Sequence, residues 1–137
     1  MSGLVLIDTS ALLAIANPRD QYHADALAIV RRHVAAGGRF LGSALVLGEL
    51  HGHLLHRRGP VVARRVLIAL LDDPVYEWLE VSAAWVRAAT STWLERYADQ
   101  RFSLTDAVSF ELMRARKVAV AFAYDDDFRT AGFQLAR

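Results

Sequence analysis

A short apolar run near the start of the chain, LVLI at residues 4–7, most constrains the fold. Every residue in it is apolar, so the run lacks the alternation of polar and apolar side chains that marks a half-exposed strand. A strand of this kind has to be covered on both faces, which happens mainly in parallel sheets flanked by helices. The run therefore predicts a central parallel strand at 5–7.

Helical and strand patterns alternate along the rest of the chain. Apolar periodicity predicts helices over about 10–16, 21–36, 44–58, 60–71, 83–99 and 104–116. Shorter apolar runs predict strands near 39–42, 76–81 and 118–123, with a last short edge strand at 133–135. The alternation is typical of an α/β protein with an open, mainly parallel sheet of about five short strands and helices on both faces.

Composition excludes several classes of function. The 137 residues are 54% apolar and 23% charged, and no linker or repeat divides them, so we expect one domain over residues 1–137. The absence of cysteine excludes disulfides, thiolate metal sites and thiol catalysis. The net charge of +1 gives no broad positive field for coating DNA. Without a basic leader or an apolar run near the ~20 residues of a membrane span, we expect a cytoplasmic protein with no membrane association.

Acidic residues occupy the positions where α/β proteins bind ligands. Asp8 directly follows the first predicted strand, and Asp125 follows the strand predicted at 118–123. Asp106 opens a predicted helix, and Glu49 lies within another between residues that look core-facing. Because ligands gather at the carboxyl ends of parallel strands, these four carboxylates are candidates for one shared site.

A shared site of carboxylates requires a cation, since like charges held close together raise each other's pKa. Oxygen-only ligands suit Mg²⁺ or Mn²⁺, and both ions support hydrolysis of phosphodiesters. A plainer interpretation stays open for each acid alone. Asp8 and Asp106 are equally well explained as helix caps, and Asp126 and Asp127 as solvated turn residues.

Four segments, taken in order, resemble the PIN-domain ribonucleases and, within them, the VapC-type toxins of bacterial toxin–antitoxin pairs. The segments are LVLIDTSALLAI at 4–15, GEL at 48–50, SLTDAVSFELMRA at 103–115 and AFAYDDDFRTAGF at 121–133. The resemblance assigns the four family acids to Asp8, Glu49, Asp106 and Asp125. It also assigns supporting roles to Thr9 or Ser10 beside the first acid, and to Thr105 beside the third.

The resemblance implies a three-layer α/β/α fold and a metal-dependent endoribonuclease that uses Mg²⁺, with Mn²⁺ able to replace it. It further implies a small cognate antitoxin and a homodimer. The closing turn departs from the commonest family form because Asp126 and Asp127 stand where basic residues or His often occur, so either could also serve the metal. Two alternatives remain: a housekeeping PIN nuclease without an antitoxin, and a non-catalytic module that binds RNA or a partner.

The segment HGHLLHRRGPVVARR at 51–65 is the most basic part of the chain. Its four arginines, which could contact RNA phosphates, are Arg57, Arg58, Arg64 and Arg65. His53 and His56 share a helical face with Glu49, although salt-bridging or surface roles are favoured for both. The stripe formed by Trp85, Trp93 and Tyr97 is expected to lie in the core or at a dimer face rather than to stack on bases.

Overall fold

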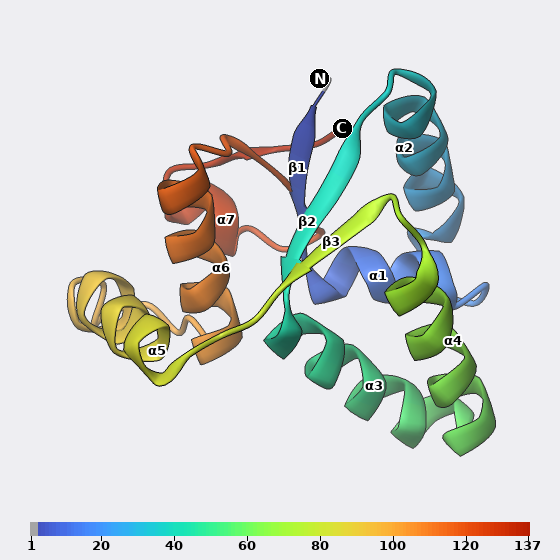
Figure 1. The fold of residues 1–137 in the computed structure, drawn as a ribbon, viewed down its shortest axis with the longest axis horizontal. Helices are drawn as coiled ribbons and strands as arrows, with labels where there is room; N and C mark the ends of the chain where they lie inside the picture. The colour runs from blue at the N-terminus through green and yellow to red at the C-terminus, as the bar shows by residue number, and fades with distance from the viewer. Residues whose placement is uncertain (1–2) are drawn as a thin grey trace.

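The computed structural model describes residues 3–137 (Figure 1). Within that range the strands are β1 (Leu4–Ile7), β2 (Arg39–Ser43), β3 (Tyr76–Leu79), β4 (Val120–Phe122) and β5 (Gln134–Leu135). The helices that precede β3 are α1 (Thr9–Ala16), α2 (His23–Ala35), α3 (Ala44–Arg58) and α4 (Pro60–Asp72). Those after it are α5 (Ala83–Ala89), the π-helix η1 (Thr90–Glu95), α6 (Leu104–Arg116) and α7 (Asp127–Thr130).

The strands form one parallel sheet in the order β3-β2-β1-β4-β5. The central position of β1 confirms the prediction made from LVLI. Leu6 is level with Leu41 of β2 and with Ala121 of β4, and the Asp8 amide continues the ladder by donating to the Phe122 carbonyl at 3.0 Å. The register therefore brings the ends of β1 and β4 side by side.

Helices cover both faces of the sheet, as expected for three α/β/α layers. Figure 1 shows α1 to α4 on one side of the strands and α5 to α7 on the other. Side chains of β1 alternate between the two cores that result. Val5 and Ile7 pack with residues of α1 to α4, whereas Leu6 packs with residues of α5, η1, α6 and α7.

Two elements differ from the sequence predictions. The helix expected at 83–99 ends its α-helical part at Ala89 and continues as η1 only to Glu95. At this junction the Thr90 hydroxyl donates to the Val86 carbonyl at 2.8 Å, and such side-chain competition disturbs helical hydrogen bonding. The four-residue helix α7 was missed, because residues read as a solvated turn begin it at Asp127.

The aromatic stripe on α5 and η1 contributes to the core. Trp93 is buried, and its ring packs edge-on against Phe110 and stacks on Tyr97. Its indole N–H donates to the buried Glu111 carboxylate at 3.2 Å, which gives the one polar atom of the ring a partner. The core location predicted for this stripe is therefore confirmed for Trp93.

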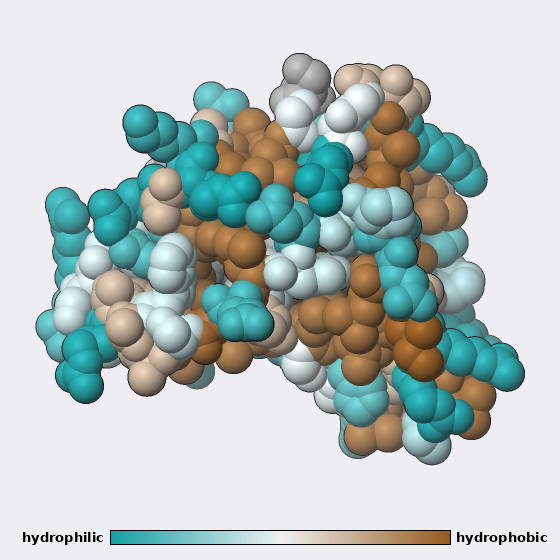
Figure 2. Space-filling view, in the orientation of Figure 1, coloured by the Kyte–Doolittle hydropathy of each residue, from teal (hydrophilic) through white to brown (hydrophobic). Residues whose placement is uncertain are grey.

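Part of the surface over α3 and α4 is apolar. Exposed large side chains of these helices include Leu55, Val61, Ile68 and Leu71. Figure 2 shows hydrophobic atoms gathered over α4, beside charged groups at the edge of the molecule. In residues 3–137, no helix is both long enough and apolar enough to cross a membrane.

Gly42 of β2 tests how tightly the sheet is packed. A Cβ at Gly42 would lie 2.5 Å from a ring carbon of Trp78, which is fixed by an N–H bond of 3.0 Å to the Leu70 carbonyl. We expect Gly42→Ala to lower the free energy of unfolding by roughly 1–3 kcal/mol through overpacking. Gly48→Ala is the matched control, because a Cβ there meets no atom within 4 Å. At this exposed helical position the higher helix propensity of alanine should raise the free energy of unfolding by up to about 1 kcal/mol. Urea unfolding measures both changes, and equal stabilities of the two variants would contradict this packing.

Candidate active site

Asp8 ends β1 and caps α1 at the same time. Its carboxylate accepts hydrogen bonds from the Ser10 amide at 3.2 Å and from the Ser10 hydroxyl at 2.8 Å. The side chain is only 4% exposed, because β1 lies at the centre of the sheet between β2 and β4. The helix-cap interpretation is therefore correct, and it places a nearly buried carboxyl at the sheet edge.

Asp106 lies in the first turn of α6, where it forms a capping box with Ser103. Its Oδ2 accepts the Ser103 amide at 3.1 Å, and its own amide donates to the Ser103 hydroxyl at 3.0 Å. The box fixes the Asp106 side chain at the N-terminal end of the helix, where a negative charge is favoured. Again the capping role does not remove the residue from the site.

Asp125 follows β4 and is held by the start of α7. Its Oδ1 accepts the Asp127 amide at 3.0 Å. Because β4 pairs with β1, Asp125 follows its strand beside Asp8, and its charge contributes to the raised pKa of Asp8. Asp8 and Asp125 therefore lie at the carboxyl ends of neighbouring strands.

Burial and mutual repulsion disfavour ionisation of all three carboxyls. Burial, with the charges of Asp125 and Asp106 adding to it, raises the pKa of Asp8 from 3.8 to about 7. Burial also raises the pKa of Asp106 to about 6, assisted by the charges of Asp125 and Asp127. The pKa of Asp125 is raised by burial and then by Asp127 and Asp126. We call Asp8, Asp106 and Asp125 the acid cluster.

A match to the PIN-domain family extends over residues 5–134, which is nearly the whole chain. The chain belongs to the PIN-domain family. It is 32% identical over 130 residues to the "23S rRNA-specific endonuclease VapC20" of Mycobacterium tuberculosis, covering 95% of each protein. This result confirms the family resemblance of the sequence motifs.

Solved structures give the same answer. The crystal structure of M. tuberculosis VapC20, described as a sarcin-ricin loop cleaving toxin, matches with a TM-score of 0.85 and 30% identity over 94% of this chain and 95% of that one. VapBC2 of Rickettsia felis (TM-score 0.66, 15% identity, 98% of this chain and 97% of that one) shares the fold. FitAcB of Neisseria gonorrhoeae does so too (TM-score 0.67, 13% identity, 97% and 96%).

Glu49 is the remaining PIN acid expected from the sequence. It is half-buried on α3, and in the part of the chain that the structure describes it makes no hydrogen bond or ion pair. The partner expected for it is therefore not provided by another side chain of residues 3–137.

Asp127 is the acid that sequence analysis undervalued. It is half-buried, and its charge raises the pKa of both Asp106 and Asp125. The signal in the sequence was the D-x-D spacing, which lets the amide of the second Asp cap the carboxylate of the first. Asp126, by contrast, is exposed and pairs with Arg129 at 3.4 Å.

The supporting residues of the PIN motifs differ in their contacts. Ser10 bonds Asp8 as described, whereas the hydroxyl of Thr9 is buried and has no partner within residues 3–137. Thr105 is half-buried in the first turn of α6, next to Asp106. Ser43, at the end of β2, carries a second unpartnered buried hydroxyl that the sequence did not single out.

The basic residues lie farther from the sheet edge. Arg57 and Arg58 are exposed in the last turn of α3, about 20 Å along the helix axis from its start beside β2. Arg64 and Arg65 are exposed on α4, which packs against α3. His53 and His56 are exposed on α3. Their contact with RNA therefore stays a prediction.

The chemistry of the acid cluster fits a hard divalent cation. Its donors are all carboxylate oxygens, which are the ligands that such a cation prefers. The raised pKa values mean that ionising these groups lowers the stability of the folded, metal-free protein. Across residues 3–137, no group of three acidic or histidine side chains is already arranged as a set of metal ligands. Binding an ion would therefore require these carboxylates to turn towards it.

The raised pKa of Asp8 predicts how stability varies with pH in the metal-free protein. The folded state holds its proton more tightly than the unfolded chain, so stability is highest below pH 4 with respect to this group and is lost as the pH rises towards 7. Asp8→Asn, which keeps an N-cap side chain, should raise the free energy of unfolding by roughly 2–4 kcal/mol at pH 8 in EDTA. Urea unfolding from pH 4 to 8 measures this effect.

Asp99→Asn is the control, because it removes an exposed carboxyl and leaves Asp8 in place. We expect this variant to lose stability between pH 4 and 7 as the wild type does. Identical pH profiles for Asp8→Asn and the wild type would show that ionisation of Asp8 does not lower the stability of the fold.

Proposed function

We propose that this PIN-domain protein is a divalent metal-dependent endoribonuclease that uses Mg²⁺ or Mn²⁺. The observation that carries the proposal is the acid cluster, in which three aspartates from β1, α6 and the end of β4 share one sheet edge with raised pKa values. Folding alone gives no reason to gather like charges in a partly buried place, since each costs stability there. A site that binds a cation and a phosphodiester does give a reason to gather these carboxylates.

Each carboxylate of the acid cluster is oriented by local hydrogen bonds to one of its oxygens. Ser10 holds Asp8, Ser103 holds Asp106, and the Asp127 amide holds Asp125. One oxygen of each group is thereby fixed, and the other is left for the cation or for a neighbouring acid. We propose that these three acids hold the metal, with Glu49 approaching from α3 as the fourth.

When bound, a divalent cation lowers the pKa of a water molecule and stabilises negative charge on the phosphate that is cut. The protein's own part is to orient the carboxylates and to exclude bulk water from Asp8.

RNA is the proposed substrate because the relative VapC20 is named as a 23S rRNA-specific endonuclease. The solved structure of that relative is described as a toxin, so we also propose a small cognate antitoxin for this chain. The exposed apolar side chains on α3 and α4 provide surface for a protein partner, either the antitoxin or a second copy in a homodimer. A non-catalytic module would not need the acid cluster.

Cleavage of purified ribosomal RNA tests the nuclease function. We expect the wild type to cut it with Mn²⁺ or Mg²⁺ and to be inactive in EDTA, and Asp8→Asn to lose at least a hundredfold in rate because one metal ligand is gone. Asp99→Asn, prepared in the same way, should retain full activity and thereby excludes a contaminating nuclease. Equal cleavage by the wild type and Asp8→Asn, or none by either, would contradict the proposal.

Thermal unfolding tests cation binding independently of the RNA. A ligand at a hundredfold excess over its Kd stabilises the folded state by about 2.7 kcal/mol, so Mn²⁺ should raise the Tm of the wild type measurably. Asp106→Asn should reduce that increase, whereas Asp99→Asn should retain it. An increase of the same size in Asp106→Asn and the wild type would remove Asp106 from the metal site.

A further inference from the structure

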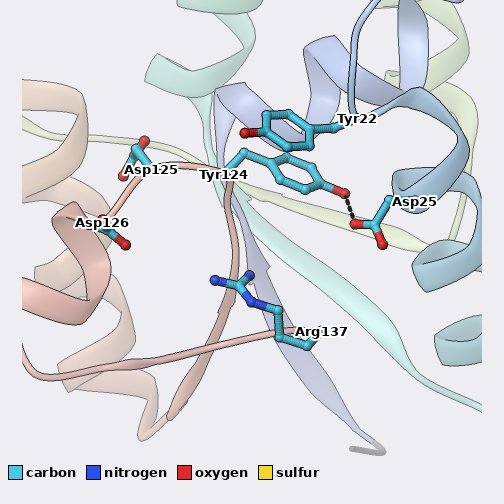
Figure 3. Close-up of a pocket in the computed structure, with 6 residues that line it drawn as sticks. All are labelled: Tyr22, Asp25, Tyr124, Asp125, Asp126 and Arg137. Atoms are coloured by element: carbon cyan, nitrogen blue, oxygen red, sulfur yellow. Dashed lines mark hydrogen bonds between the residues drawn. The ribbon is translucent and has the colours of Figure 1, made fainter.

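We propose that the pocket beside the acid cluster binds an unpaired nucleobase of the RNA, with Tyr22 as the ring on which the base stacks. The pocket has a volume of about 400 Å³ and is lined by Tyr22, Asp25, Tyr124, Asp125, Asp126 and Arg137 (Figure 3). Asp125 belongs both to this lining and to the acid cluster. The inference rests on the proposed function, because its ligand is part of the RNA strand that is cut.

Two tyrosine rings form a flat aromatic wall in this pocket. The rings of Tyr22 and Tyr124 are parallel within 7°, and their centroids lie 4.3 Å apart. Tyr124 is the inner ring, since it packs edge-on against the buried Phe122. Tyr22 is the outer ring and is 39% exposed, so part of its surface is free to contact a ligand.

Hydrogen bonds fix the Tyr124 side chain and the backbone that carries Tyr22. The Tyr22 amide donates to Asp20 at 2.8 Å, and the neighbouring His23 ring contacts the Ala14 carbonyl at 2.7 Å. The Tyr124 hydroxyl donates to Asp25 at 2.6 Å, as the dashed line in Figure 3 shows. Fixed rings lose little entropy when a base stacks on them, so a preorganised wall binds more tightly than mobile side chains.

One hydroxyl connects the aromatic wall to the acid cluster. The Ser10 Oγ accepts the Tyr124 amide at 3.0 Å and donates to Asp8 at 2.8 Å. The position of the inner ring is thereby tied to the first acid of the site. A nucleotide stacked on the wall would place its sugar and phosphate in register with the carboxylates.

The lining carries one positive group, Arg137, and the three carboxylates of Asp25, Asp125 and Asp126. Figure 3 shows the Arg137 guanidinium pointing towards the segment that carries Tyr124 and Asp126. Burial and the nearby Asp25 raise the pKa of the Tyr124 hydroxyl, and the positive charge of Arg137 offsets part of this rise. Arg137 can contact a phosphate of the strand, while the uncharged base avoids repulsion from Asp125 and Asp126.

Binding measured in EDTA tests the inference without cleavage. The probes are a fluorescent single-stranded oligouridine and a strand of the same length and charge that lacks bases. We expect the wild type to bind oligouridine more tightly than the baseless strand. Tyr22→Ala should weaken oligouridine binding about tenfold, because stacking on one aromatic ring is lost, and should leave the baseless strand unaffected.

Matched variants separate stacking from folding and from charge. Tyr22→Phe keeps the ring and should bind both strands as the wild type does, and Gln21→Ala, its exposed neighbour, should also have no effect. Arg137→Ala should weaken both strands equally. Thermal unfolding of each variant shows whether the fold is retained.

Equal affinity of the wild type for the two strands, including no binding to either, would overturn the inference. So would unchanged oligouridine binding by a folded Tyr22→Ala variant, and this result would leave the pocket free for a segment of a partner protein. Metal-dependent cleavage of ribosomal RNA by the wild type is measured separately. The nuclease function can therefore stand while the base pocket fails, or fail while the base pocket stands.

Discussion

The electrostatic cost of the acid cluster is the constraint on which the rest of the structure depends. Asp8 follows the central strand of the sheet and is nearly buried, so it is not solvated as a surface carboxylate would be. Asp125 lies beside it because β4 is the neighbouring strand, and α6 adds Asp106 from the other layer. Such local destabilisation persists in folded proteins where function requires it and the remaining structure outweighs its cost.

The two apolar cores supply that excess stability. Side chains of β1 alternate strictly between them, so each face of the central strand is fully covered. The local hydrogen bonds of the three aspartates belong to helix caps and a turn, which the fold needs in any case. Orienting the acids therefore requires few additional interactions, because the hydrogen bonds that cap α1 and α6 also fix the direction of the carboxylates.

The sequence predicted the parts of this arrangement that depend on local pattern. An apolar run without alternation identifies β1 as a central strand, and the acids that follow β1 and β4 then meet at one edge for geometric reasons. Cap and ligand were treated as competing interpretations of Asp8 and Asp106, whereas the structure shows that a capping side chain can also face a site. Local pattern does not separate the two roles.

Features that depend on tertiary contacts were not predictable in this way. Tyr22 and Tyr124 are 102 residues apart, and nothing in either neighbourhood indicates that the rings stack. The contribution of Asp127 requires the start of α7, a helix too short to leave a periodic pattern. Glu49 forms no hydrogen bond or ion pair within residues 3–137, so its place in the metal site stays a prediction from its motif.

The charge distribution also limits how RNA can approach. Phosphates are repelled by the acid cluster until a cation neutralises it, and the arginines at the end of α3 lie about 20 Å along the helix from the sheet edge. Contacts that do not depend on charge are therefore the ones able to hold a strand close to the carboxylates. An aromatic wall joined to Asp8 through the Ser10 hydroxyl provides such a contact at the place where it is required. Binding of the base would then precede, and position, the charged part of the substrate.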